Sequence, residues 1–149
     1  MIKIRPIREN EVGAAQHVIS TVCSEFFGQA PVEFEDMDDI QSQYSGDVGA
    51  FLVLVDDEKV VGTGAIRRLD DTTCELKRMW FLKEYRGCGL GIKMAHMLLE
   101  CARQMGYRRV RLDTSPNLEQ AVRLYQKLGF EFIEPYNNGP CTLFMEKTL

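Results

Sequence analysis

A strand, a glycine-rich turn and an amphipathic helix follow one another in the middle of the chain. Residues 74–82 have the apolar composition of a strand, and the turn is Arg86-Gly87-Cys88-Gly89-Leu90-Gly91. Apolar residues then recur at three- and four-residue steps as far as Gly106, which is the residue type favoured just beyond a helix. Glycine lets a backbone turn tightly, so the helix must begin directly beside the end of the strand. This succession predicts an α/β chain.

The start of such a helix is suited to binding an anion. Its first N–H groups have no partner within the helix, and the helix dipole adds partial positive charge. Arg86 places a full charge beside them. A phosphate-binding P-loop is excluded because no GxxxxGK[ST] occurs, and the dinucleotide fingerprint would need glycine where Ile92 stands. By itself the turn leaves phosphate binding and a purely structural role both open.

The rest of the chain supplies strands and helices on either side. Further strands are predicted at residues 2–7, 50–55, 59–66, 109–114, 130–133 and 142–145. Helices are predicted from a cap at Asn10 to Gly28, and from Asn117, with Gln120 in the spacing of a capping box, to Gly129. A short helix is expected near residues 40–44. The order predicts a mixed sheet with helices on both faces and a parallel strand–helix–strand crossover.

Composition limits the classes of function. The 149 residues suit one domain, residues 1–149, and the net charge of −4 argues against general nucleic-acid binding. Five cysteines without a CxxC pair or a zinc-type spacing predict a reduced cytoplasmic protein without a metal. The first residues lack the apolar core of a signal peptide, and no apolar run approaches the roughly 18 residues of a membrane span.

Three segments together resemble the GCN5-related N-acetyltransferase (GNAT) family. Residues 86–91 match its R/Q-x-x-G-x-G/A motif. Residues 75–81, Glu-Leu-Lys-Arg-Met-Trp-Phe, resemble its central strand, and residues 117–130 match N-x-x-x-A-x-x-x-Y-x-x-x-G-F. The resemblance is strong over residues 74–133. It implies a mostly antiparallel sheet of about six to seven strands, in which the strands at 75–82 and 109–114 splay apart around acetyl-CoA.

The resemblance also implies how each motif would bind the coenzyme. The pyrophosphate would lie on the turn, formed by Arg86, Gly87, Cys88, Gly89, Leu90 and Gly91. The pantetheine arm would pair with strand backbone at Met79, Trp80 and Phe81. One N–H group there would point at the thioester oxygen, where a fixed donor stabilises developing negative charge. Asn117 matches a residue that contacts pantetheine, although it could equally cap its helix.

Two side chains are candidates for proton transfer. Tyr125 matches the family's general acid, which protonates the departing thiolate, and a phenol with a pKa of about 10 can do so. Its place on the apolar stripe of its helix suits a core residue as well. Glu75 matches a carboxylate that acts as general base in some members, because only a neutral amine attacks. Its alternative role is a structural salt bridge.

The acceptor is less constrained than the coenzyme. The resemblance implies acetyl transfer to an amine of a small molecule or amino acid. A protein or peptide acceptor and a non-catalytic acyl-CoA-binding module remain alternatives. The acceptor side would be formed by residues 26–45 and 134–141, and the acidic cluster within 33–39 is either a solvated surface or an attraction for a cationic amine. The final strands could expose a sheet edge, which predicts a possible homodimer.

Overall fold

A single seven-stranded mixed sheet organises the structure, a computed structural model that describes residues 1–28, 32–44 and 46–149. The strand order is β1-β2-β3-β4-β5-β7-β6. The strands are β1 (Ile2–Pro6), β2 (Ala50–Asp56), β3 (Lys59–Arg68), β4 (Thr73–Phe81), β5 (Arg109–Thr114), β6 (Glu131–Phe132) and β7 (Leu143–Thr148). Only the β4–β5 pair is parallel among the pairings of this sheet. The predicted order and the parallel crossover through residues 74–114 are confirmed.

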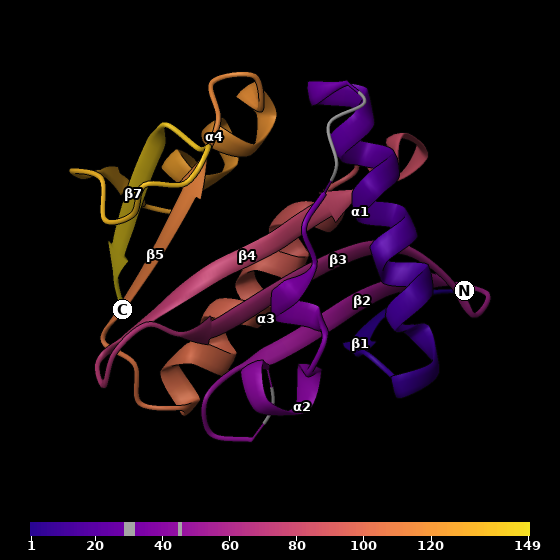
Figure 1. Ribbon diagram of the computed structural model, residues 1–149, viewed down its shortest axis with the longest axis horizontal. Helices are drawn as coiled ribbons and strands as arrows, with labels where there is room; N and C mark the ends of the chain where they lie inside the picture. The colour runs from indigo at the N-terminus through magenta and orange to yellow at the C-terminus, as the bar shows by residue number, and fades with distance from the viewer. Residues whose placement is uncertain (29–31, 45) are drawn as a thin grey trace.

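Helices cover both faces of the sheet, as the sequence predicts. They are α1 (Val12–Phe27), α2 (Ile40–Gln43), α3 (Leu90–Gln104) and α4 (Glu119–Lys127). In Figure 1, α1 lies in front of the central strands and α3 behind them, while α4 lies beside the upper end of β5. Short 3₁₀ turns at Glu9–Glu11, Glu35–Met37 and Lys83–Tyr85 join these elements.

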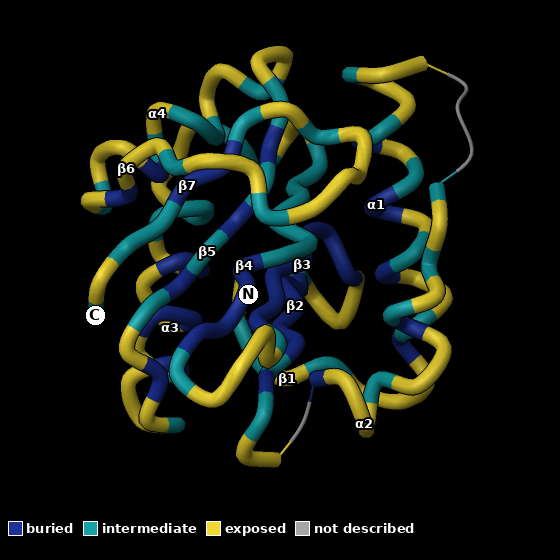
Figure 2. Tube along the Cα trace, turned by 60° about the vertical axis from the view of Figure 1, so that its left-hand side comes forward, coloured by how far each residue is buried: buried dark blue, intermediate teal, exposed yellow. Residues whose placement is uncertain are grey.

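Each face of the sheet carries its own apolar core. Along β2, Leu52 and Leu54 point to the α3 side, whereas Phe51 and Val53 point to the α1 side, because successive strand residues face opposite ways. Figure 2 shows these central strands in dark blue, with exposed residues at the periphery. Burying one such side chain contributes roughly 1.5–3 kcal/mol, so the sheet is held from both sides.

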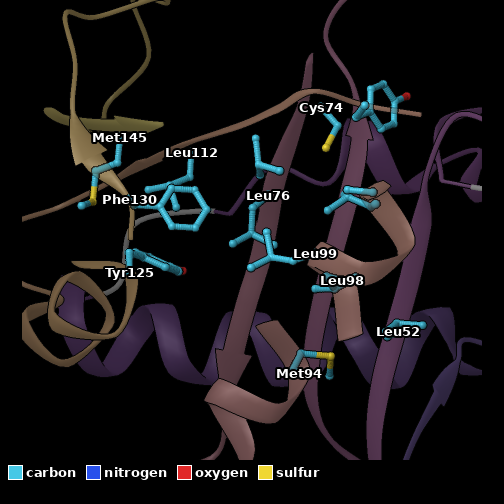
Figure 3. Packing of buried hydrophobic residues seen from close by; sticks show 14 of the residues in the cluster. Leu52, Cys74, Leu76, Met94, Leu98, Leu99, Leu112, Tyr125, Phe130 and Met145 are labelled. Carbon is cyan, nitrogen blue, oxygen red and sulfur yellow. The ribbon is translucent and has the colours of Figure 1, made fainter. Parts of the chain in front are cut away.

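The core on the α3 side of the sheet connects α3 and β4 with β5, α4 and β7. Leu98 and Leu99 of α3 pack with Leu76 of β4, and the cluster continues through Leu112 to Tyr125 of α4. Figure 3 shows these side chains in one layer, with Phe130 and Met145 at its far end. Packing of α4 in this layer determines where Tyr125 lies relative to β4 and β5.

Two predicted helix caps are wrong. The 3₁₀ turn Glu9–Glu11 precedes α1 and moves its cap position from Asn10 to Glu11, where no side chain of the described residues caps the helix. The Glu11 carboxylate instead accepts the backbone N–H of Arg8 at 2.9 Å. Arg5 holds that carboxylate with two hydrogen bonds of 2.8 Å. At α4 the cap position is Leu118, and no side chain caps the helix.

Asn117 stands outside α4 because the preceding turn closes locally. The N–H of Leu118 donates to the backbone oxygen of Ser115 at 3.0 Å, and the N–H of Asn117 donates to the Ser115 hydroxyl at 3.3 Å. The last strands are also shifted from their predicted bounds: β6 is only Glu131–Phe132, and β7 runs on to Thr148. β6 forms one edge of the sheet.

Candidate active site

The two parallel strands β4 and β5 begin as a pair and then part. Pairing joins Thr73–Glu75 to Arg109–Arg111 and stops there. β4 nevertheless continues to Phe81 and β5 to Thr114, where β5 keeps its pairing with β7 alone. Figure 1 shows the two strands diverging toward α4. The predicted splay between residues 75–82 and 109–114 is therefore present.

A cleft of about 700 Å³ opens where the strands part. Its walls come from the C-terminal part of α1, the end of β4, the glycine-rich turn with the first residues of α3, and α4 with its approach. Nine of the eleven residues predicted to contact the coenzyme line it, namely Met79, Trp80, Phe81, Arg86, Gly87, Gly89, Gly91, Asn117 and Tyr125. Cys88 and Leu90 belong to the same turn but not to the wall. The structure thus brings three sequence-distant motifs to one cavity.

A β-bulge reorients β4 at the cleft. Ala65 of β3 pairs with Lys77 and Thr63 pairs with Trp80, so two residues of β4, one of them Arg78, stand opposite a single residue of β3. Arg78 has a left-handed φ of 60°, which is rare for a residue with a side chain, and the Thr63 hydroxyl donates to its backbone oxygen. Bulges of this kind re-aim the residues that follow.

The side chain of Arg78 is held on the α1 side of the sheet. Its guanidinium pairs with the carboxylate of Asp36, donates to the backbone oxygen of Glu33 at 2.9 Å, and lies 5.4 Å above the ring centroid of Phe34. The Tyr44 hydroxyl donates to the same carboxylate. This buried network fixes the bulge and with it the course of β4 along the cleft.

The glycine-rich turn has the backbone and the space that an anion requires. Gly87 and Gly89 have φ of 76° and 84°, and a Cβ at either would meet no atom of the described residues within 4 Å. Gly89 occupies the cap position of α3 without a side-chain hydrogen bond to the helix. The start of α3 thus lies at the wall of the cleft, lined by Gly87, Gly89 and Gly91, an arrangement that fits a phosphate group.

Arg86 is engaged by α1. Its guanidinium forms two hydrogen bonds with the Glu25 carboxylate, at 2.6 and 2.8 Å, and donates to the backbone oxygen of Phe81 at 2.8 Å. It also lies 5.1 Å above the Phe26 ring centroid. Arg86 thus ties the glycine-rich turn to α1, and Glu25 partly neutralises its charge. The role of Arg86 at a phosphate stays a prediction.

Tyr125 belongs to the core and to the cleft wall at once. Only 6% of it is exposed, and its ring packs edge-on against Phe130 with centroids 5.8 Å apart. Burial raises the pKa of its phenol above the ordinary value, and the negative charge of Asp113 raises that pKa further. Figure 3 shows its hydroxyl directed away from Met145, toward the side where Leu76 lies. The hydroxyl consequently keeps its proton at neutral pH.

Glu75 lies at the last paired position before the strands part. It is 3% exposed and is absent from the lining of the cleft. One carboxylate oxygen accepts from Arg67 at 3.2 Å, and the other accepts from the Tyr136 hydroxyl at 2.7 Å. The structure therefore shows the predicted salt bridge, and it adds a tie to the segment 134–141.

Several residues of the cleft wall were not among those predicted to contact the coenzyme. Val22 and Glu25 line the cleft because α1 crosses the sheet there, together with Phe26, which belongs to the predicted acceptor flank. Arg123 and Lys127 of α4 also line it, and their only sequence signal was a position within two residues of Tyr125. The predicted acceptor flank 26–45 includes residues 29–31 and 45, which lie outside the described residues.

Two kinds of site are not found in the described part of the chain. No group of three or more histidine, cysteine or carboxylate side chains there could hold a metal ion. Within the same residues, no helix has the length and apolar character needed to cross a membrane.

Comparisons with known proteins agree with this geometry. The model of the Acetyltransferase (GNAT) family matches residues 17–130. An uncharacterized N-acetyltransferase of Escherichia coli (strain K12), YjgM, is 40% identical over 102 residues, which cover 66% of this chain and 61% of that protein. The chain thus spans less than two thirds of the length of the curated relatives that it matches first.

Solved structures show the same fold. An acetyltransferase of the GNAT family from Staphylococcus aureus Mu50 superposes with a TM-score of 0.89 at 20% identity, covering 99% of both chains. The PaiA N-acetyltransferase of Thermoplasma acidophilum, solved in complex with coenzyme A, superposes with a TM-score of 0.80 at 16% identity, covering 100% of this chain and 99% of the other. With its splayed strands, its glycine-rich turn and the family match over residues 17–130, the chain belongs to the GNAT family of acetyltransferases.

Proposed function

We propose that this chain is an N-acetyltransferase that moves an acetyl group from acetyl-CoA directly to a primary amine of a small molecule or amino acid. The observation that carries the proposal is the parting of β4 and β5 into a cleft that has an uncapped helix start at one end and Tyr125 in its wall. Family membership supports the reaction class, and the coenzyme A complex of the Thermoplasma neighbour supports the cosubstrate.

The chain's residues divide the binding work. Bound acetyl-CoA would supply a thioester as the activated acetyl donor. The amides of the turn 86–91 would receive its pyrophosphate, because the turn lines the cleft at the positive end of α3. The backbone of residues 79–81 would pair with the pantetheine arm, since β5 does not pair with β4 beyond Glu75. Asn117 also lines the cleft, where it can contact the same arm.

Tyr125 is the residue we assign to proton transfer at sulfur. Its buried hydroxyl stays protonated because burial raises the pKa, so it can donate that proton to a sulfur that leaves as a thiolate. A non-catalytic acyl-CoA-binding module would have no need of such a donor in the cleft wall. Tyr125 therefore favours a transferase over a sensor.

The segment 134–141 limits the space that is available to the acceptor. Tyr136 ties this segment to Glu75, and Asn137 ties it to Asp113 at 2.8 Å. A segment pinned at two points over the strand ends leaves less room than the open groove that a peptide requires. This favours a small acceptor.

The remaining expectations concern the setting of the protein. All five cysteines carry free thiols, the state maintained in the cytoplasm, which supports a cytoplasmic enzyme. We propose one catalytic domain over residues 1–149, and a homodimer remains a prediction that a sedimentation experiment would test.

Calorimetry with acetyl-CoA, free coenzyme A and ATP tests the proposal first. We expect saturable binding of both coenzymes and none of ATP, followed by release of thiol when amines are added with acetyl-CoA. Absence of coenzyme binding at millimolar concentration would overturn the proposal. Binding without thiol release from any amine would instead indicate a binding module.

A further inference from the structure

The register of β4 and β5 identifies the first side chains on either side of the opening. Glu75 pairs with Arg111 as the last parallel partners. Two residues further along each strand stand Lys77 and Asp113, which keep to the same face because strand side chains alternate. They therefore flank the mouth of the split on the face opposite the α3-side core.

Among the described residues, Asp113 differs from the neighbouring carboxylates on this face in that it forms no ion pair. Glu75 pairs with Arg67, and Glu146 pairs with Arg111 at 2.8 Å. Asp113 is only partly buried and accepts a hydrogen bond from the Asn137 amide at 2.8 Å. In the part of the chain that the structure describes, no lysine, arginine or histidine forms an ion pair with it. Its negative charge is thus available to a cation that enters the split.

Lys77 is the complementary group across the opening. Its ammonium nitrogen lies 3.8 Å from a Glu75 oxygen, a long contact, and that oxygen already accepts from Arg67 at 3.2 Å. The other oxygen of Glu75 is taken by the Tyr136 hydroxyl. The Lys77 side chain is 26% exposed, so its charge can also meet an anion.

The Cys141 thiol lies within electrostatic reach of both Asp113 and Lys77. Burial raises the pKa of Cys141 to about 11; the carboxylate of Asp113 raises it as well, whereas Lys77 lowers it. Asp113 also raises the pKa of Tyr125, as burial does. Asp113 therefore lies within electrostatic reach of the proposed proton donor and of the segment that covers the acceptor side.

We propose that the acceptor is a zwitterion of the amino-acid class, whose ammonium group is received by Asp113 and whose carboxylate is held by Lys77. This inference rests on the proposed acetyltransferase function. The acceptor nitrogen loses two protons as its bond to the acetyl carbon forms and the carbon–sulfur bond breaks. The first proton passes to the Asp113 carboxylate and on to solvent. The second replaces the proton that Tyr125 gives to sulfur, so Tyr125 ends the cycle as it began.

The same geometry assigns Glu75 a positioning role in place of the general base. Its carboxylate is fully engaged by Arg67 and Tyr136 and is almost completely buried. Its bond with the Tyr136 hydroxyl fixes the segment 134–141, and its 3.8 Å contact with the Lys77 ammonium aligns that side chain. The carboxylate that can take a proton from an incoming amine is the one on β5.

A panel of acceptors tests this assignment. Each standard amino acid is compared with its carboxamide and its decarboxylated amine, with thiol release as the measure. We expect transfer to an amino acid. Lys77→Met should raise KM for that acceptor about tenfold, the scale of one hydrogen bond to a charged group, and should leave KM for the decarboxylated amine unchanged. Asp113→Asn should lower kcat/KM for both by roughly 10²–10⁴-fold, the loss typical of a missing base. The matched controls are Lys59→Met, at the exposed start of β3, and Asp71→Asn, in the exposed turn before β4.

Binding of the product supplies a measurement that does not depend on turnover. An N-acetyl amino acid keeps its carboxylate but has no ammonium group. In calorimetry with free coenzyme A present, Lys77→Met should therefore weaken its binding about tenfold, whereas Asp113→Asn should leave that binding unchanged.

The two proposals fail in different ways. Equal turnover of amino acids, amides and decarboxylated amines would overturn the zwitterion assignment while the transferase stands, as would a Lys77→Met effect that is the same for every acceptor. Transfer to peptides alone would do so too. Absence of coenzyme binding and of thiol release from all amines would overturn the transferase itself.

Discussion

The buried ion pair between Asp36 and Arg78 should be the most sensitive electrostatic contact in the protein. Their side chains are 9% and 12% exposed, and the Asp36 carboxylate also accepts from the Tyr44 hydroxyl. Asp36→Asn keeps the size of the side chain but removes its charge. The Arg78 guanidinium would then be buried without a counterion, which costs about 3–5 kcal/mol. The substitution would also weaken the contacts that hold Arg78, and with it the β-bulge that directs β4 along the cleft.

Urea unfolding at pH 7, followed by circular dichroism, measures this cost. With an m-value of about 2 kcal/mol/M, a loss of about 3–5 kcal/mol lowers the midpoint by about 1.5–2.5 M. The matched control is Asp71→Asn, which breaks the exposed pair with Arg68, whose two side chains are 86% and 51% exposed. Exposed pairs contribute about 0–1 kcal/mol, so this midpoint should move by about 0.5 M at most.

Lowering the pH provides a second test of the same pair. Burial alone would raise the pKa of Asp36, but hydrogen bonds from Arg78 and Tyr44 outweigh it and the pKa is lowered. Stability from a lowered carboxyl pKa is complete above the unfolded value of about 4 and is lost as pH falls through the folded value. The gap between wild type and Asp36→Asn should therefore close below pH 4. Equal midpoint shifts for Asp36→Asn and Asp71→Asn at pH 7 would refute the reasoning.

Three further variants test the cleft and the core. Tyr125→Phe should lower kcat by roughly 10²–10⁴-fold, while calorimetry shows unchanged coenzyme binding. Because the pKa of Tyr125 is raised, deprotonation of its phenol should not lower the wild-type rate between pH 7 and 9. An unchanged kcat would remove Tyr125 from the mechanism. Gly89→Glu should abolish acetyl-CoA binding. The matched control is Gly106→Glu, which should lose only stability, because Gly106 has a φ of 90°, close to the 84° of Gly89, and equally open space around its Cβ position. Acetyl-CoA binding by Gly89→Glu would mean that the pyrophosphate binds elsewhere. Leu98→Ala, at a fully buried position, should cost about 2–5 kcal/mol in urea unfolding, and a loss under 1 kcal/mol would contradict the packing of α3.

Local signals predicted the elements better than their ends. The helix stops at Gly28, Gly106 and Gly129 are confirmed, because each glycine adopts the positive φ that ends a helix. The starts at Asn10 and Asn117 are wrong, because the 3₁₀ turn Glu9–Glu11 and the turn closed at Ser115 move the cap positions to Glu11 and Leu118. Capping is decided by which acceptor a turn places nearby, and spacing along the chain does not contain that information.

The sequence alone determined three features of this protein. They are the glycine-rich turn, the order of strands and helices, and the place of Tyr125 on its helix. Each depends on contacts within a few residues, so periodicity and glycine content are sufficient to specify them. The tertiary structure decided that Glu25 would pair with Arg86, that Tyr136 would donate a hydrogen bond to Glu75, and that Asn137 would donate one to Asp113. These pairings join residues up to 61 positions apart. They exist because the sheet brings β4, β5, α1 and the final segment together, and no pattern in one stretch of chain specifies which charges will meet there.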